Sequence, residues 1–283
     1  MAVSEIEALN TDEPERRQPR LSFLVTGFGP FRDAPENPST VIVTKLVCYL
    51  KEREAVATEQ NNDRTLLSSV TTTKIFETAA LTVRSELDAI FEQLPETDGE
   101  KQSDIIVILH LGVNYRGKSF QIERYAYNDA TFRIPDEKGY QPTGECLLPE
   151  ERKKELGFQM ETTLRVGDLC NDMIERGFTN NDDQSTAAGG NKTNQKGNEV
   201  VVVSTDPGRF VCNYTYCYGL DKCNAFNETS PLNDSNPSSN QRPRLHALFL
   251  HVPPFKREPE ERQLDFVAQL MNAIRNQLLH TSR

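Results

Sequence analysis

The chain has 283 residues, and its 32 basic and 42 acidic side chains give a net charge of −10 without a basic stripe interleaved with aromatic residues. This balance argues against nucleic acid as a partner. The first 20 residues are charged, contain proline and lack a continuous apolar stretch, so they predict a disordered tail that is neither a signal peptide nor a membrane anchor.

After this tail, apolar runs of strand length alternate with segments of helical periodicity. Strands are expected near Leu21, Val70, Ile105, Phe120, Val200 and Leu245. Helices are expected over residues 40–51, 76–94, 159–176 and 258–279. Such alternation predicts an α/β protein, a three-layer α/β/α sandwich with a mostly parallel central sheet. We expect a single domain over residues 21–283.

Two polar stretches interrupt this domain, at about 179–198 and 224–244. Both are rich in Asn and Ser and bury little apolar area, so they are expected to be surface excursions. The second stretch can either cover a neighbouring site or act as a disordered spacer, and its composition favours the spacer.

Cys212 lies where the buried run 200–203 gives way to a helix, shortly after Gly208. A thiol at a helix N-terminus faces unpaired backbone N–H groups and the positive end of the helix dipole, which favour a thiolate. The same N–H groups can hold an oxyanion. Because cysteine is among the most buried residue types, a packing role for Cys212 is equally compatible with its position.

A thiolate nucleophile needs a base, and the chain has only four histidines, at positions 110, 246, 251 and 280. His251 closes the apolar run 245–250 and is followed by two prolines, while His110 closes a similar run, 105–109. The carboxyl ends of parallel strands share one edge of a sheet, so Cys212 can meet either histidine there. The ordinary alternative for each is a hydrogen-bonded core imidazole.

Glu123 is the candidate to orient that base. It lies in a segment, 119–128, with the alternation and aromatic content of a strand. A carboxylate inside a strand must be paired or hydrogen-bonded. Pairing with Arg124 or Arg133, or exposure to solvent, remains an alternative at this point.

Four segments, in order, resemble the pyroglutamyl-peptidase I family, the cysteine peptidases that remove N-terminal pyroglutamate. They are residues 25–31 (VTGFGPF) with 37–39 (NPS), 123–128 (ERYAYN) with 133–136 (RIPD) and 139–142 (GYQP), 207–213 (PGRFVCN), and 249–253 (FLHVP). The resemblance spans most of residues 21–279. It implies an α/β/α fold of the phosphorylase/hydrolase-like type and an omega peptidase activity that uses no metal or cofactor.

The resemblance also assigns roles at matching positions. Cys212 matches the nucleophile, His251 the general base and acid, and Glu123 the carboxylate that orients the histidine, in a Cys-His-Glu triad that forms a thioester. Arg133 matches an arginine near the site and is a candidate to hold developing negative charge. An ion pair of Arg133 with Glu123 or Asp136 is an equal contender.

Phe28 and Phe31 match the aromatic residues that line the family's pyroglutamyl pocket. They follow the first strand on a Gly-Pro turn, so at least one ring should project over the crevice rather than into the core. Aromatic walls suit a flat, neutral lactam. Asn37 can reach the lactam, although the Asn-Pro-Ser sequence favours a helix N-cap.

The chain departs from several bacterial members after the strand that ends near Leu111. Tyr115 and Arg116 stand where those members carry a small, glycine-rich turn. These bulkier side chains bear on which residues form the floor of the substrate pocket and on which residues contact the substrate residue after the cleaved bond. In the glutamate segment, Phe132 is also bulkier than usual and can be either a substrate contact or packing.

Cysteine use predicts a cytoplasmic location. The six cysteines have no metal-type spacing, and if Cys212 stays free the other five cannot all pair. The Asn213-Tyr214-Thr215 sequon adjoins Cys212, and a glycan there obstructs the site, so activity implies a chain outside the secretory pathway.

The expected partners are peptides with N-terminal pyroglutamate, with no nucleic acid and no membrane; a monomer and a homo-oligomer fit the sequence equally. Two other functions stay open. A catalytically silent relative would only bind modified peptide N-termini. A phosphorylase on a similar sandwich would use the turn at 27–29 as a phosphate cradle, but that turn contains no basic residue.

Overall fold

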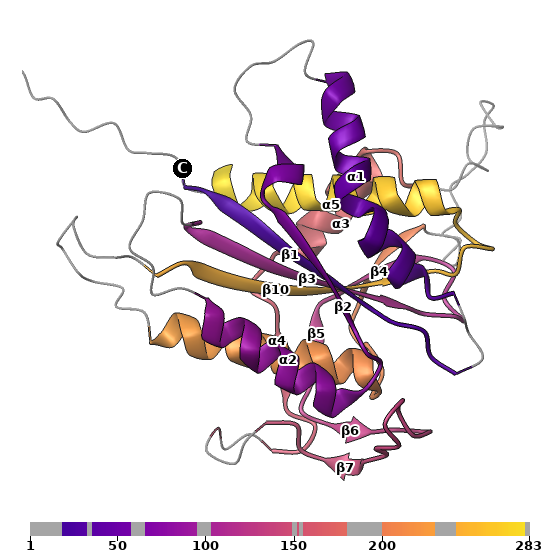
Figure 1. Cartoon of the computed structure of the whole chain (residues 1–283), viewed down its shortest axis with the longest axis vertical. Helices are drawn as coiled ribbons and strands as arrows, with labels where there is room; N and C mark the ends of the chain where they lie inside the picture. Colours follow the sequence, from indigo (N-terminus) through magenta and orange to yellow (C-terminus); the bar gives the residue numbers. More distant parts are fainter. Residues whose placement is uncertain are drawn as a thin grey trace, which may run out of the picture.

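The computed structural model describes residues 19–32, 36–57, 66–94, 103–148, 152, 155–179, 200–229 and 242–280. The predicted tail 1–20 lies outside this part except for its last two residues, and so do positions 180–198 of the first polar insertion. The described residues form three layers, with helices on both faces of a twisted central sheet (Figure 1).

The central sheet has six strands in the order β2-β1-β3-β10-β4-β9. β1, β2, β3 and β10 run parallel, and β9 pairs parallel with β4. The one reversal is the antiparallel pairing of β10 with β4. The sheet is thus mostly parallel, as predicted. Its strands are β1 (Leu21–Phe28), β2 (Thr71–Phe76), β3 (Ile105–Val113), β4 (Phe120–Glu123), β9 (Val201–Ser204) and β10 (Arg244–Val252).

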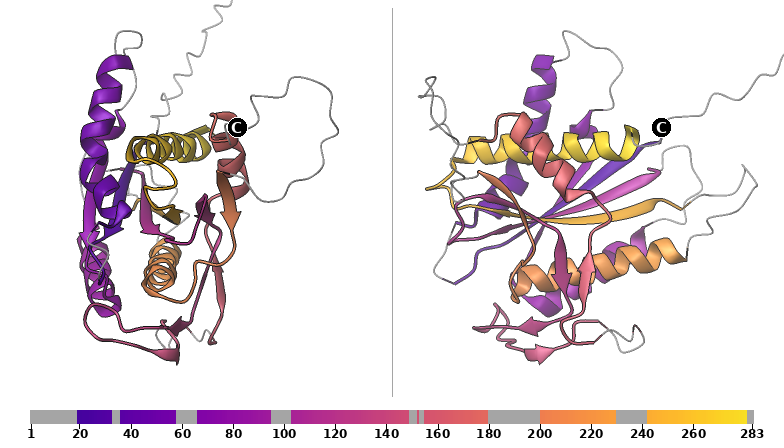
Figure 2. Two further views of the ribbon diagram at one scale, coloured as in Figure 1. Left: turned by 90° about the vertical axis from the view of Figure 1, so that its right-hand side faces the viewer. Right: turned by 180° about the vertical axis from the view of Figure 1, so that it is seen from behind.

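The helices divide between the two faces of the sheet. α1 (Pro38–Ala57), α3 (Val166–Glu175) and α5 (Glu260–His280) cover one face, and α2 (Ala80–Gln93) and α4 (Val211–Glu228) cover the other (Figures 1 and 2). Each face buries its own apolar cluster. Central strands such as β3 and β10 are apolar on both sides because both faces are covered.

Two small sheets extend the fold beyond these layers. β5 (Tyr125–Tyr127) pairs with β8 (Gln159–Glu161), and β6 (Ala130–Thr131) pairs with β7 (Thr143–Glu145). The β6–β7 sheet lies below α2 and α4, on the side away from the main sheet (Figure 1). The sequence predicts the extended conformation near Glu123 but neither of these pairings, because strands of two or three residues carry too little periodicity to detect.

Four predicted boundaries are wrong. The helix expected over 40–51 continues to Ala57 as α1. The helix expected from 76 begins at Ala80, because the β-branched run that precedes it continues as β2 through Phe76. The helix expected from 159 begins at Val166, because residues 159–161 pair with β5 and form strand β8. The second polar stretch was expected from 224, but α4 continues to Glu228; positions 230–241 lie outside the described residues.

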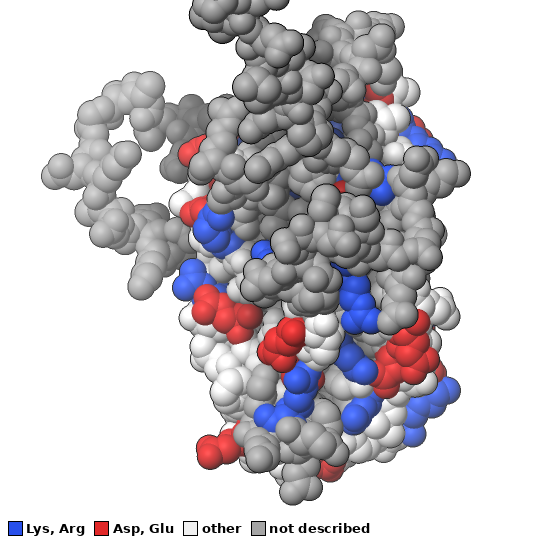
Figure 3. Space-filling model, turned by 90° about the vertical axis from the view of Figure 1, so that its left-hand side faces the viewer, with Lys and Arg blue, Asp and Glu red and all other residues white. Residues whose placement is uncertain are grey.

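The surface carries charges of both signs. On the face drawn in Figure 3, basic and acidic side chains are intermingled among the coloured atoms rather than gathered into regions of one sign. In the described part of the chain, no helix combines the length and apolar character needed to cross a bilayer.

Candidate functional site

A cavity of about 710 Å³ opens beside the carboxyl ends of the parallel strands. Residues after β1, after β3 and before α4 line it, together with the end of β10. Its volume is in the range of small-molecule sites. Cys212 and His251 are both part of its wall, so the structure brings the two main sequence candidates into one cavity.

Cys212 is the second residue of α4 and is partly exposed to the cavity. The helix has no side-chain N-cap, and its first hydrogen bond runs from the Tyr214 N–H to the Phe210 carbonyl. The preceding N–H groups, including that of Cys212, have no intrahelical acceptor. They and the helix dipole therefore favour negative charge at this end of α4.

The chain reaches Cys212 differently from the sequence expectation. β9 is antiparallel to β10, so it does not end at the shared carboxyl edge. Residues 205–210 carry the chain from β9 to the start of α4. Gly208 in this loop has a φ of 82°, a left-handed conformation that glycine adopts without strain.

His251 and Glu123 form a buried hydrogen-bonded pair. His251 Nδ1 lies 2.8 Å from Glu123 Oε1, and the side chain of Cys212 hydrogen-bonds to the same imidazole. His251 is the penultimate residue of β10, and Glu123 is the last residue of β4, which pairs with β10. The antiparallel pairing of β4 with β10 therefore places the Glu123 carboxylate beside the His251 imidazole.

The protonated form of His251 is strongly favoured. Burial opposes protonation, but the Cys212 thiolate and, after it, the Glu123 carboxylate raise the pKa of His251 to about 10. The imidazole therefore keeps a proton beside the sulfur at neutral pH. This arrangement places a protonated imidazole between the Cys212 sulfur and the Glu123 carboxylate.

Glu123 is fully buried, and neither Arg124 nor Arg133 makes an ion pair with it among the described residues. Its charge is compensated by His251 instead. The hydroxyl of Tyr216, on α4, donates a 2.9 Å hydrogen bond to the Glu123 carbonyl, which ties the helix that carries Cys212 to the strand that carries Glu123.

The two other buried histidines are structural. His110 lies inside β3 rather than at its end, and its Nδ1 is 2.7 Å from the Thr26 hydroxyl. His246 pairs in the same way with Thr163. Burial lowers the pKa of His110 to about 3 and that of His246 to about 4, so both are neutral. Neither lines the cavity.

The cavity has an aromatic wall built from Phe28, Phe31 and Phe210. The Phe31 and Phe210 rings lie 5.4 Å apart between centroids. Phe28 is only 3% exposed and packs at 6.4 Å from Phe249, so it belongs to the core as well as to the wall. Phe132 is buried behind Phe210, at 4.7 Å, and is a packing residue.

Asn37 caps α1. Its Oδ1 accepts hydrogen bonds from the backbone and hydroxyl of Ser39, and its Nδ2 donates to the Gly29 carbonyl. Pro38 occupies the first position of the helix. Asn37 nonetheless contributes to the cavity wall.

Arg133 is exposed and lines the cavity. The ion pair that competed with a site role is absent from the described residues, since the Asp136 carboxylate instead accepts three backbone N–H groups, those of Ala80, Lys138 and Tyr140.

Two residues beside Cys212 had no assigned role in the site. Asn213 is fully buried, and its amide exchanges hydrogen bonds with the backbone N–H and carbonyl of Tyr127. The sequon at Asn213 is thus part of the core, with no surface for a glycan. At Gly112, a Cβ would lie 2.7 Å from the Phe249 ring and 3.1 Å from Cys212 Sγ, so only glycine fits beside the thiol. Neither role is detectable without the fold.

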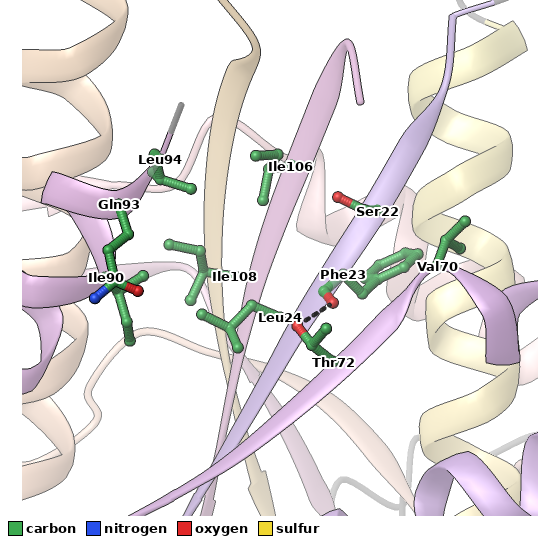
Figure 4. Close-up of a pocket in the computed structure, with 10 residues that line it drawn as sticks. All are labelled: Ser22, Phe23, Leu24, Val70, Thr72, Ile90, Gln93, Leu94, Ile106 and Ile108. Carbon is green, nitrogen blue, oxygen red and sulfur yellow. Dashed lines mark hydrogen bonds between the residues drawn. The ribbon is translucent and has the colours of Figure 1, made fainter. Parts of the chain in front are cut away.

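A second, smaller cavity lies at the opposite end of the sheet. It has a volume of about 290 Å³ and lies between α2 and the amino ends of β1, β2 and β3 (Figure 4). Its wall is mostly aliphatic, as at Leu24, Ile90 and Ile108, and contains no titratable side chain. It offers no group for acid, base or nucleophilic chemistry.

The family model for pyroglutamyl peptidase matches residues 21–196, which is 176 of the 283 residues. This span includes Glu123 and ends before Cys212 and His251. A curated relative, the pyrrolidone-carboxylate peptidase of Bacillus subtilis (strain 168), is 26% identical over 236 residues, which cover 83% of this chain and 79% of the relative.

Solved structures share the fold. Pyroglutamyl peptidase I from Bacillus amyloliquefaciens superposes with a TM-score of 0.58 at 17% identity, covering 89% of this chain and 96% of the other. Pyrrolidone carboxyl peptidase from the hyperthermophile Pyrococcus furiosus gives 0.58 at 18% identity, covering 91% and 100%.

Proposed function

This chain belongs to the pyroglutamyl peptidase family of cysteine-type hydrolases, and we propose that it hydrolyses the bond after an N-terminal pyroglutamyl residue with Cys212, His251 and Glu123 as its catalytic triad. The observation that carries this assignment is the meeting of Cys212 and His251 in the wall of one cavity, with Cys212 and the buried Glu123 carboxylate both hydrogen-bonded to His251.

The arrangement supports acyl transfer in two steps. The Cys212 thiolate attacks the pyroglutamyl carbonyl carbon, and the N–H groups at the start of α4 hold the resulting oxyanion. His251 then gives its proton to the leaving amine as the C–N bond breaks, leaving a thioester. In the second step, neutral His251 takes a proton from water, which attacks the thioester and releases pyroglutamate. Glu123 holds the imidazole in orientation throughout.

The aromatic wall fits the proposed substrate. Pyroglutamate is a flat lactam without a charged amine, so aromatic packing against Phe31, Phe28 and Phe210 can bind it where an acidic aminopeptidase site cannot. Asn37 uses one amide hydrogen for Gly29 and has a second one to offer the lactam carbonyl. Arg133 adds positive charge near the oxyanion, a role favoured by its position at the cavity without an ion pair among the described residues.

The assay that tests this function compares release of a fluorescent amine from pyroglutamyl-, alanyl- and prolyl-amides, with and without a thiol reductant. We expect turnover of the pyroglutamyl substrate alone, strengthened by reductant. Equal turnover of the alanyl substrate, or tight binding of pyroglutamyl peptides without any turnover, contradicts the proposal; the second result identifies a catalytically silent relative.

Removing the Glu123 charge should change the pH profile. Cys212 and Glu123 raise the pKa of His251 to about 10. Below that pH, His251 therefore keeps the proton that the leaving amine needs, and above that pH it loses this proton. We expect the alkaline limb of kcat/KM near pH 10 in the natural enzyme. Glu123→Gln should move this limb to lower pH. At neutral pH it should reduce turnover less than His251→Ala does. An unshifted limb contradicts the pairing.

Phe28→Ala and Phe31→Ala should have different effects, because only Phe28 is also a core residue. Phe31→Ala should weaken pyroglutamyl binding by about 1–3 kcal/mol, seen as a higher KM, with little loss of melting temperature. Phe28→Ala should also destabilise the fold by about 3–5 kcal/mol. Phe120→Ala, which removes a ring stacked on Phe266, is a stability-only control. An unchanged KM in both cavity variants contradicts the pocket assignment.

We propose a cytoplasmic location for the enzyme. Exposed Cys48 and Cys146 form no disulfide in the described structure, and the nucleophile itself must remain a thiol. Its partners are then peptides that carry N-terminal pyroglutamate, and the reaction consumes only water.

A further inference from the structure

The cavity is positively charged in a chain that is otherwise acidic. Besides the catalytic pair, its wall contains three arginines, at 116, 133 and 209, and one acidic residue, Asp206, whereas the whole chain has a net charge of −10. This local reversal of sign makes the cavity attractive to anionic groups.

Arg209 and Asp206 neutralise each other. Arg209 Nη1 lies 2.6 Å from Asp206 Oδ1, and its Nε lies 3.2 Å from Asp129 Oδ2. The guanidinium also lies over the Tyr127 ring, at 3.9 Å from its centroid. Arg209 therefore fixes the loop before Cys212 and offers no charge to a ligand.

Arg116 and Arg133 remain as cavity cations, since neither makes an ion pair with another described residue. Arg133 has a role near the oxyanion in the proposed function. Arg116 has none, and its side chain is exposed at the cavity.

The loop that carries Arg116 is anchored beside the catalytic histidine. Asn114 N–H donates to the Val252 carbonyl, next to His251, and Asn114 Nδ2 donates to Gln121 on β4. Asn114 Oδ1 in turn accepts the backbone N–H of Arg116 at 3.1 Å. The loop follows Gly112, whose backbone passes beside the Cys212 sulfur. Arg116 is thus held at the cavity by a fixed backbone.

The chemistry of the substrate decides where an anion can lie. The pyroglutamyl lactam is neutral and its backbone carbonyl is the reacting group, so any carboxylate of a pyroglutamyl peptide lies beyond the cleaved bond. We propose, on the basis of the function proposed above, that Arg116 binds a carboxylate of the leaving part of the substrate and makes the enzyme prefer peptides with an acidic group close to that bond.

This carboxylate can be the side chain of an acidic second residue or the terminal carboxylate of a dipeptide. Two matched pairs separate these sources: pyroglutamyl-glutamate amide against pyroglutamyl-glutamine amide, and pyroglutamyl-alanine against its amide. The value of kcat/KM is measured for each substrate with the natural enzyme, R116Q, R116K and K118Q. Lys118 is a matched control because it is exposed on the same loop but does not line the cavity.

We expect the acidic member of at least one pair to be preferred about three- to tenfold by the natural enzyme, as an ion pair at a partly open site allows. K118Q should keep this preference, R116K should retain part of it, and R116Q should reduce it to about one. Added salt should weaken it in the natural enzyme.

A natural enzyme without preference in either pair, or a preference that survives in R116Q, overturns the role of Arg116. The neutral substrate, pyroglutamyl-alanine amide, separates this result from failure of the proposed function. If the enzyme hydrolyses this substrate but shows no acidic preference, only the role of Arg116 is rejected. If the enzyme does not hydrolyse this substrate at all, both the peptidase assignment and this inference are rejected.

Discussion

Cys212→Ser should lower turnover of a pyroglutamyl amide by about three to six orders of magnitude while the fold is retained. In the proposed mechanism the thioester forms on this sulfur, and serine at the same position lacks a thiolate that His251 can pair with. The change is small and the side chain is only half-buried, so the melting temperature should move little. Steady-state kinetics and thermal unfolding on the same preparation measure both effects.

The other cysteines provide matched controls for this result. Cys48→Ser and Cys146→Ser remove exposed thiols and should leave turnover intact. Cys217→Ser and Cys223→Ser alter buried positions of the nucleophile helix and should stay active at some cost in stability. Burial raises the pKa of the Cys223 thiol, which makes it inert to alkylation.

Intact-mass analysis with limiting alkylating reagent, on a C48S/C146S background, should show one modified site, Cys212, in step with loss of activity. Full inactivation by modification of another cysteine would rule out Cys212 as the nucleophile.

His251→Ala should lower turnover by at least about three orders of magnitude, because both proton transfers pass through this imidazole. The variant also removes the cation that stabilises the Cys212 thiolate and leaves the buried Glu123 carboxylate without its 2.8 Å partner. We therefore expect slower alkylation of Cys212 at neutral pH, together with a lower melting temperature. Both quantities distinguish loss of the base from general damage to the site.

The buried histidines away from the cavity are the controls for this variant. His246 lies on the same strand as His251, and His110 lies on the neighbouring one, but their hydroxyl partners are Thr163 and Thr26. Replacing either by alanine should cost stability and leave kcat/KM within about tenfold of the natural value. An inactive His110 variant beside an active His251 variant would mean that the base comes from β3.

Much of the fold is predictable from local patterns. The apolar runs that became β3 and β10 are long and bounded by turn or proline signals, and the stripe on α5 has strong helical periodicity. Local patterns do less for the site. A cysteine at the start of a helix, a histidine shortly before two prolines and a carboxylate within a strand marked the candidates, but each kept a structural alternative until the resemblance of four ordered segments to a known family assigned roles.

The sequence by itself determined the main strands and helices and the candidate site residues, because periodicity and turn residues act over a few positions. Only the tertiary structure decided how these residues meet. Glu123 and His251 are 128 positions apart, and they pair because β4 runs antiparallel to β10, a direction that no local pattern encodes. The burial of Phe28, in contrast to half-open Phe31, likewise depends on a contact with Phe249 on a strand that is distant in sequence.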